Sequence, residues 1–448
     1  MMKRGRMVSG ALMALILLAN CRNPVDIHRP GDFNHAGFNF SGAFESFWNG
    51  MNMYYVFWDV EPLHYWDTVW DTYKPRFSSL QSRLEGGENA YTLLAEAHRY
   101  FGEFLAPLAD GHLFVFFDFG LPRISPGLDR VDARFSGLAA NNNPRRAFFA
   151  STWSGVPFTA NPDYTNYNFW EYTIRNYVTI NARSFPFNPG PIPAYVEPGS
   201  VFRAATGRIP YSGGGFILYF YSSAFLLLEY AAYEYDAYRI IMQYLNDIAS
   251  PDLRGVIIDL RGNTGGYTEE INMLLDRLVH ERLHFAYIRY KSGLNRLDLT
   301  PWIPYYITPH PNPAERVQND VPVVALIDDF SISCGELAPM AISRMPRGYL
   351  IGTRSFGATG PRFSDFSPAL LNGGSFLNLS GNTLWNQVVL AGFQTRSAAH
   401  RSYEGVGIPP NLTIAFDWAE FYGDGNGSGR DRQLLAAIRH IDPAYTGP

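Results

Sequence analysis

Apolar residues are spaced differently in the early, middle and late parts of the chain. Between residues 39 and 113 they recur every three or four positions, which predicts helices that bury one face. The predicted helices cover residues 44–55, 67–73 and 91–105. Pro75 is expected to end the second helix. This part is therefore predicted to form a small helical cap domain.

From residue 215 to residue 448, short apolar runs alternate with amphipathic stretches. The runs predict strands at 216–220, 256–260 and 323–327, and the stretches predict helices at 236–248, 269–280, 335–343 and 431–441. Strands without a polar face are typical of a sheet covered by helices on both sides. The predicted fold class is therefore α/β, a β/α core preceded by the helical cap.

The middle part, residues 114–214, is rich in proline, glycine, asparagine and aromatic residues. Short runs such as residues 177–180 suggest strands separated by turns. No glycine-rich loop typical of a carboxylate-binding peptide module is evident, so no such module is predicted. We expect an irregular, β-rich region of unknown role.

The amino end has the features of an export signal. A basic start is followed by an apolar stretch over about residues 7–19, shorter than the roughly 20 residues that span a bilayer. The stretch ends in Leu-Ala-Asn-Cys at Cys21, which resembles a bacterial lipobox. We expect a signal peptide over 1–20, lipidation of Cys21 and a tether over 21–38; the alternative is an ordinary secretory signal.

Composition excludes several classes of protein. Aromatic residues make up 16% of the chain, too many for a disordered protein. Two cysteines exclude a disulfide scaffold, and a net charge of −5 argues against a nucleic-acid partner. The histidines form no His-Glu-x-x-His pair and no cofactor fingerprint is present, so neither a metal nor a cofactor is expected.

A glycine-rich turn follows the second predicted strand of the late part. Residues 259–266 read Asp-Leu-Arg-Gly-Asn-Thr-Gly-Gly, directly before a predicted helix. Glycines allow a sharp turn whose backbone N–H groups can bind an anion or an oxyanion. Alone, such a turn can also be purely structural.

A serine-containing segment follows the next apolar strand. Residues 331–336 read Ser-Ile-Ser-Cys-Gly-Glu and open a predicted helix. A nucleophile there would gain from the positive end of the helix. The alternative is that Ser331 or Ser333 only caps the helix, with Glu336 completing a capping box.

A histidine lies at the end of the helical cap, in the sequence Leu-Ala-Asp-Gly-His that ends at His112. A histidine before an apolar run is usually a packed or surface residue. It becomes a candidate base only in combination with the other two motifs.

Taken in order, these motifs resemble the C-terminal processing (tail-specific) protease family, and more closely its tricorn-core branch. The matches are the D-x-R-x-N-x-G-G turn at 259–266, Ser333 three residues before Glu336, Phe356-Gly357 after the next strand, an acid before a G-V-x-I-P-x-N sequence at 404–411, and His112 closing the cap. The resemblance covers most of the chain except the middle part.

One departure concerns the base. Processing proteases use a serine–lysine dyad, with lysine after the Phe-Gly pair, where this chain has Ala358. The three lysines of the chain, Lys3, Lys74 and Lys291, all precede Ser333. A lysine base is therefore not expected.

The tricorn-like branch implies a different arrangement. Ser333 would be the nucleophile, His112 its base, and Glu404 the group that orients and stabilises the imidazole. The backbone N–H groups of Cys334 and Gly265 would form the oxyanion hole. Cys334 stays open as a rival nucleophile, because a thiol at a helix start can be activated.

The resemblance implies a serine endopeptidase, and the amino-terminal sequence implies that it is exported and lipid-anchored in the cell envelope, facing the periplasm or the exterior. Its partners would be peptides or unfolded protein segments and, through Cys21, the membrane; no nucleic acid is expected. A catalytically inactive relative that binds peptides or apolar ligands is the first alternative. A surface adhesin or carbohydrate binder, suggested by the aromatic content, is the second.

Overall fold

The computed structural model describes most of the cap and of the core. The described residues are 39–62, 64–105, 107–117, 132–133, 177–178, 180–186, 203–232, 234–318, 320–361, 376–377, 384–417, 420–421 and 429–447. The predicted signal peptide, Cys21 and its tether, and most of the middle part lie outside them. No helix within these ranges has both the length and the apolar character needed to cross a membrane.

Three helices form the cap, as the apolar spacing predicts: α2 (Phe40–Tyr54), α3 (Tyr65–Glu85) and α4 (Ala90–Leu105). Their shared core is aromatic, with Phe47 contacting both Phe101 and Trp385 edge-to-face. Such contacts stabilise a core beyond simple burial. Packing thus accounts for the aromatic residues of the cap.

The prediction that Pro75 ends the second helix is wrong, because α3 continues through it to Glu85. A proline inside a helix costs about 3 kcal/mol through the lost hydrogen bond and the ring clash. The following turns place Phe77 and Leu80 in the core of the cap, where both are fully buried. This burial offsets the cost of the proline.

Late residues complete the cap with a four-stranded sheet. Its order is β11 (Phe376–Leu377), β12 (Trp385–Val389), β1 (Phe114–Phe117), β2 (Asp132–Ala133). Trp385 is fully buried, and its indole N–H donates to the Ala43 carbonyl at 2.9 Å. The cap therefore draws on both halves of the chain, which the sequence pattern did not indicate.

The core is built on a seven-stranded sheet. Its order is β14 (Leu412–Thr413), β10 (Gly348–Gly352), β9 (Val323–Ile327), β6 (Leu253–Asp259), β5 (Phe216–Ser222), β4 (Arg203–Pro210), β3 (Ile180–Pro186). The strands from β14 to β5 are parallel to one another. Strand β4 is antiparallel to β5, and β3 is antiparallel to β4. The sheet thus begins within the middle part, earlier than residue 215.

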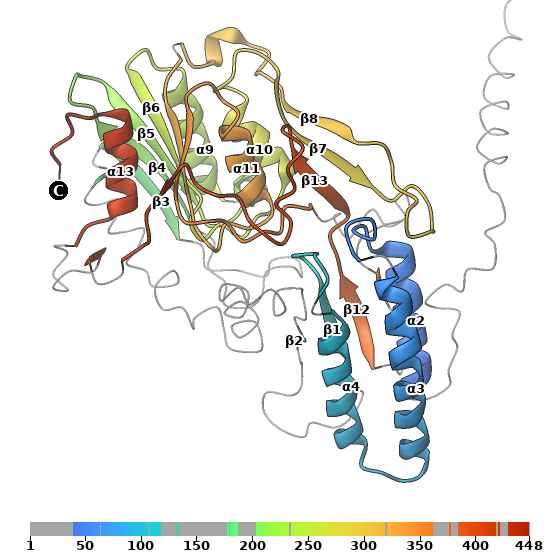
Figure 1. Cartoon of the computed structure of the whole chain (residues 1–448). Coiled ribbons are helices and arrows are strands. Elements are labelled where there is room, and N and C mark those ends of the chain that lie inside the picture. The colour runs from blue at the N-terminus through green and yellow to red at the C-terminus, as the bar shows by residue number, and fades with distance from the viewer. Residues whose placement is uncertain are drawn as a thin grey trace, which may run out of the picture.

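Helices cover both faces of this sheet, as expected for strands without a polar side (Figure 1). On one face lie α8 (Leu227–Ala231), α9 (Tyr235–Ile248), α10 (Thr268–Leu275) and α11 (Cys334–Ile342), and on the other lies α13 (Arg432–Ile441). Successive side chains of a strand point to opposite faces of the sheet. In β6, Ile258 therefore packs against the layer of α8 to α11, and Ile257 packs against α13.

Helix α10 ends at Leu275, five residues before the predicted end. The carbonyl groups of Asp276 and Arg277 accept hydrogen bonds from His310 and Val317, at 2.9 and 2.8 Å. Tertiary partners thus take the acceptors that would have continued the helix.

A third sheet lies between core and cap in Figure 1, in the order β13 (Phe393–Ser397), β7 (Leu283–Tyr290), β8 (Ile303–Ile307). Arg289 of β7 pairs with Asp59, which follows α2. Gln394 of β13 also donates to Asp59, at 2.5 Å. These contacts attach the cap to the core.

Candidate active site

The sequence motifs meet at the carboxyl ends of three neighbouring parallel strands, β6, β9 and β10. In open α/β sheets this edge is where ligands bind. The strands lead into three loops: a glycine-rich turn (260–266), a nucleophile loop (328–333) and a bridging loop (353–360). The loops are joined by backbone bonds from Ile332 to Asn263 and from Ser333 to Ala358, at 2.9 and 3.1 Å.

The glycine-rich turn is shaped by Asn263 and Gly265. The Asn263 side chain donates to the Ser222 carbonyl at 2.8 Å and accepts from the Gly265 N–H at 2.9 Å. Gly265 has φ 89°, and a Cβ atom there would lie 2.6 Å from the Ser333 Cβ. Only glycine allows this approach to Ser333 without strain.

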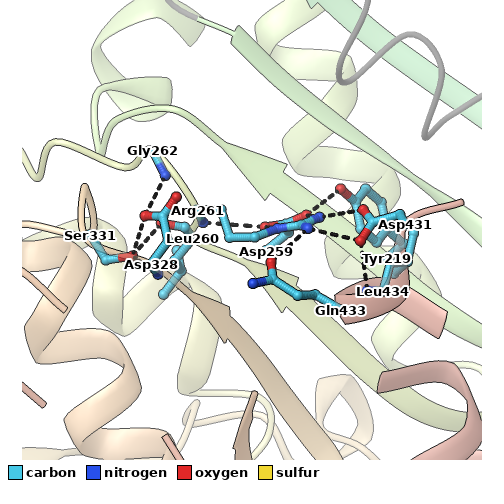
Figure 2. Close-up of polar contacts among 10 residues, drawn as sticks. All are labelled: Tyr219, Asp259, Leu260, Arg261, Gly262, Asp328, Ser331, Asp431, Gln433 and Leu434. Atoms are coloured by element: carbon cyan, nitrogen blue, oxygen red, sulfur yellow. Dashed lines mark hydrogen bonds and ion pairs between the residues drawn. The ribbon is translucent and has the colours of Figure 1, made fainter. Parts of the chain in front are cut away.

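A buried ion cluster anchors the start of this turn (Figure 2). Arg261 contacts the carboxylates of Asp259 and Asp431 with N···O distances of 2.5 and 2.8 Å, and all three side chains are fully buried. Gln433 and Tyr219 complete the cluster, bonding to Arg261 and Asp259 respectively. The arginine therefore ties strand β6 and its turn to the carboxyl-terminal helix.

Ser331 has a structural role. It is fully buried, and its hydroxyl donates to the Leu260 carbonyl at 2.8 Å and accepts from the Asp328 N–H at 3.0 Å. Figure 2 shows it holding the nucleophile loop against the glycine-rich turn. Its hydroxyl is not available to a substrate.

Ser333 is only partly buried and immediately precedes α11. Its backbone has φ 57° and ψ −118°, which a residue with a side chain rarely adopts. Strain of this kind persists only where surrounding contacts enforce it, and it gathers at functional sites. Here the Ser333 N–H donates to the Ala358 carbonyl, at 3.1 Å.

Cys334, the rival nucleophile, is 1% exposed. Its thiol donates to the Gly266 carbonyl at 3.0 Å, and burial raises its pKa to about 12. The thiolate is the reactive form of cysteine, and this environment disfavours it.

Glu336 does reach back to the Ser333 N–H, at 3.3 Å, as in the capping box. Its carboxyl group also accepts from the Ser355 hydroxyl and from the N–H groups of Gly357 and Ala358, at 2.6, 2.7 and 2.7 Å. Burial raises its pKa to about 7. Glu336 thus couples the nucleophile loop to the bridging loop, beyond the cap that the sequence suggested.

His112 and Glu404 are brought together. One ring nitrogen of His112 and one carboxylate oxygen of Glu404 lie within 4.8 Å. Glu404 accepts from the Gly111 N–H at 2.8 Å and from the Thr359 hydroxyl and the Gly360 N–H at 2.9 Å each. The glutamate is therefore held in place beside the imidazole.

The turn that carries His112 contacts the bridging loop directly. A Cβ atom on Gly111 would lie 2.6 Å from the Gly357 carbonyl oxygen and 2.7 Å from the Ala358 Cβ. The Ala358 carbonyl in turn accepts from the Ser333 N–H. His112 and Ser333 therefore lie on segments that meet at Ala358, although 221 residues separate them in the sequence.

Gly265 does not present its N–H as the sequence prediction requires, because this N–H donates to Asn263. In the described part of the chain, no protein acceptor is found for the N–H groups of Cys334 and of Gly266. These two amides are the better candidates for an oxyanion hole.

Asp110 is the site residue that sequence reasoning missed, although it belongs to the Asp-Gly-His motif. It is fully buried, and one of its oxygens lies within 4.8 Å of the ligating atoms of His112 and Glu404. Its carboxyl group accepts from the N–H groups of His112 and Ala391, at 2.7 and 2.9 Å. Burial, and then the nearby Glu404 charge, raise its pKa to about 8. Sequence reasoning also missed Thr359, whose hydroxyl donates to Glu404, because Thr359 belongs to none of the motifs.

Convergence of two carboxylates and an imidazole also occurs in metal sites. Here every carboxylate oxygen of Asp110 and Glu404 accepts at least one hydrogen bond from the protein. Because the His112 turn also meets the segment that holds Ser333, we interpret this group as an acid–imidazole arrangement.

Comparisons with known proteins give a family match and a similar fold. Residues 225–411 match the model of peptidase family S41. A candidate peptidase from Parabacteroides merdae is 19% identical, with 89% of this chain and 95% of that chain covered and a TM-score of 0.51. Mature CPAF complexed with lactacystin is 15% identical, with 90% of this chain and 98% of that chain covered and a TM-score of 0.54. No curated protein sequence matches the chain.

These structural similarities confirm the predicted α/β fold with an amino-terminal helical region. The family match covers the glycine-rich turn, Ser333 and Glu404. Residues 225–411 are therefore similar to peptidase family S41, in agreement with the serine-type peptidase that the motifs predict.

Proposed function

We propose that the protein is an endopeptidase in which Ser333 attacks the substrate carbonyl carbon while His112 takes the hydroxyl proton. The resulting tetrahedral adduct collapses to an acyl-enzyme as His112 returns the proton to the leaving amine, and water then releases the acid by the same route. The observation that carries the proposal is the meeting of the His112 turn, Glu404 and Ser333 at the bridging loop.

The surrounding groups suit the charges of this reaction. Glu404 favours the imidazolium form of His112 and keeps the ring oriented. The N–H groups of Cys334 and Gly266 would receive the oxyanion, and one such donor typically contributes about 3 kcal/mol to the transition state. The roles of Ser333, His112 and Glu404 are those that the sequence resemblance implies.

A fluorophosphonate probe tests the nucleophile. We expect labelling of the wild-type protein and of Cys334→Ala, and no labelling of Ser333→Ala, because the buried thiol is held protonated whereas Ser333 is partly exposed. Labelling that follows Cys334 instead of Ser333 would contradict the assignment.

The base is tested with an unstructured protein such as casein. The residues of the site come from distant segments joined at the cap, so we propose flexible substrates over folded domains. His112→Ala should lower kcat/KM by about 10²–10⁴-fold, the usual contribution of general acid–base catalysis. Wild-type protein that binds casein without cleaving it would favour the inactive, peptide-binding alternative.

We further propose export and lipid anchoring through Cys21, on the basis of the amino-terminal sequence alone. Labelling with a palmitate analogue should mark the wild-type protein in its cells and should be lost in Cys21→Ala. Secretion without labelling would indicate an ordinary signal peptide.

A further inference from the structure

Asp110 is built into the contact between cap and core. Its two oxygens bond to the N–H groups of His112, on its own turn, and of Ala391, between β12 and β13. The adjacent Gly111 N–H bonds to Glu404. The turn formed by residues 110–112 is thus held by the carboxyl group of Asp110, within the turn, and by that of Glu404, from a distant segment. The last residue of this turn, His112, is the proposed base.

The ionisable groups around Asp110 are mostly acidic. Glu404 faces it from the turn after β13, Glu61 from the segment after α2, and His112 from its own turn. Tyr55, which follows α2, donates to Glu61, and its hydroxyl accepts from the Asp110 N–H at 3.4 Å. The charged groups with the largest effect on the pKa of Asp110 are Glu404 and Glu61, and both raise it. Two ionised carboxylates at this spacing would repel each other strongly in a buried site.

We infer, on the basis of the proposed function, that Asp110 is a positioning residue for His112 and that it works as a neutral carboxylic acid beside the ionised Glu404. Its carbonyl oxygen and hydroxyl oxygen can both still accept the two backbone bonds, while protonation removes the repulsion between Asp110 and Glu404. One negative charge then remains to stabilise the imidazolium of His112.

This arrangement has a direct consequence for pH dependence. As the pH rises through about 8, Asp110 loses its proton and a second negative charge appears beside Glu404. Repulsion between the two carboxylates then weakens the hydrogen bonds that hold the His112 turn. Activity is expected to fall on the alkaline side for this reason, in addition to any other ionisation in the site.

The first experiment compares pH profiles of kcat/KM for casein cleavage. Wild type should show an alkaline decline near pH 8. Asp110→Asn, which is neutral at every pH and keeps one acceptor, should retain activity within about tenfold and shift that decline upward by at least about one pH unit. Asp110→Ala leaves two N–H groups without acceptors and should lose about 100-fold. An unshifted decline in Asp110→Asn, or equal losses in the two variants, would overturn the inference.

Glu270→Gln is the matched control. Glu270 is also a buried acid, with its pKa raised to about 8 by burial, but it accepts from the Leu228 N–H in the helical layer. This variant should leave the alkaline decline where it is in wild type. A decline that shifts equally in Glu270→Gln and Asp110→Asn would mean that the effect is not specific to Asp110.

A second experiment does not depend on activity. Infrared spectra of the Ser333→Ala protein at pH 7 should contain carboxylic-acid C=O absorption, to which Glu270 and Glu336 also contribute, and the part that belongs to Asp110 should be lost when Asp110→Asn is added. Persistence of the whole band would show that Asp110 is ionised and would defeat the inference, whatever the protein hydrolyses. Absence of peptide cleavage by wild type, with the band assigned to Asp110, would instead defeat the proposed function.

Discussion

At the scale of the residue, Ser333 and Cys334 show how neighbouring side chains acquire opposite character. The strained backbone of Ser333 leaves its side chain partly exposed, whereas the next residue points into the core and donates to Gly266. Both residue types are plausible nucleophiles in the sequence. Burial, which raises the pKa of the thiol, separates them.

Glu270 supports a prediction about stability. Burial raises its pKa to about 8, above the value near 4.5 of an exposed glutamate. Between these values the folded protein keeps a proton that the unfolded chain releases, so the free energy of unfolding falls as the pH rises. Glu270→Gln should therefore lose less stability than wild type between pH 5 and pH 8, measured by urea unfolding. Equal losses would contradict the prediction.

At the scale of the element, the site depends on loops that touch without intervening side chains. Gly111 lies against Gly357 and Ala358, and Gly265 lies against Ser333. These approaches bring the end of the cap and the carboxyl ends of the core strands into one place. Gly111 and Gly265 are thus needed because any side chain at these positions would collide with the neighbouring loop.

Gly111→Ala tests this contact. The new methyl group would lie 2.6 Å from the Gly357 carbonyl oxygen, so the His112 turn must move away from the bridging loop. We expect kcat/KM to fall by about 100-fold, as for a misplaced catalytic group. In the control Gly86→Ala, the nearest atoms lie at an ordinary 3.4 Å, and activity should be unchanged. Similar activity in the two variants would argue against the contact.

At the scale of the whole molecule, the site depends on segments far from it. The cap needs Trp385 and its strand from late in the chain, and the glycine-rich turn is tied through Arg261 to the last helix. The buried cluster makes α13 part of the support of the site. The helix is also capped by Asp431, which accepts from the Leu434 N–H at 2.9 Å.

Asp431→Ala should therefore be strongly destabilising. Removing one partner of a buried ion cluster leaves the Arg261 charge partly uncompensated and typically costs about 3–5 kcal/mol. Arg432→Ala, one residue along, removes only an exposed pair with Glu420 and should cost less than about 1 kcal/mol. Chemical denaturation of both variants measures the difference, and equal losses would show that the cluster does not support the fold.

Much of the fold could be predicted from the sequence, because local patterns carry it. Apolar spacing indicated the cap helices and the alternating elements of the core, including the strand Val323–Ile327. The passage of α3 through Pro75 and the early end of α10 could not be predicted, since tertiary packing and tertiary hydrogen bonds decide both.

The sequence by itself indicated a resemblance to serine peptidases and named the candidates Ser333, His112 and Glu404, because a motif consists of residue types at short spacings. The tertiary structure alone decided which groups share an environment. It joined Asp110 to His112 and Glu404, directed the Gly265 N–H to Asn263, and buried the thiol of Cys334. Burial and proximity between distant segments set charge and reactivity, and neither quantity exists until the chain has folded.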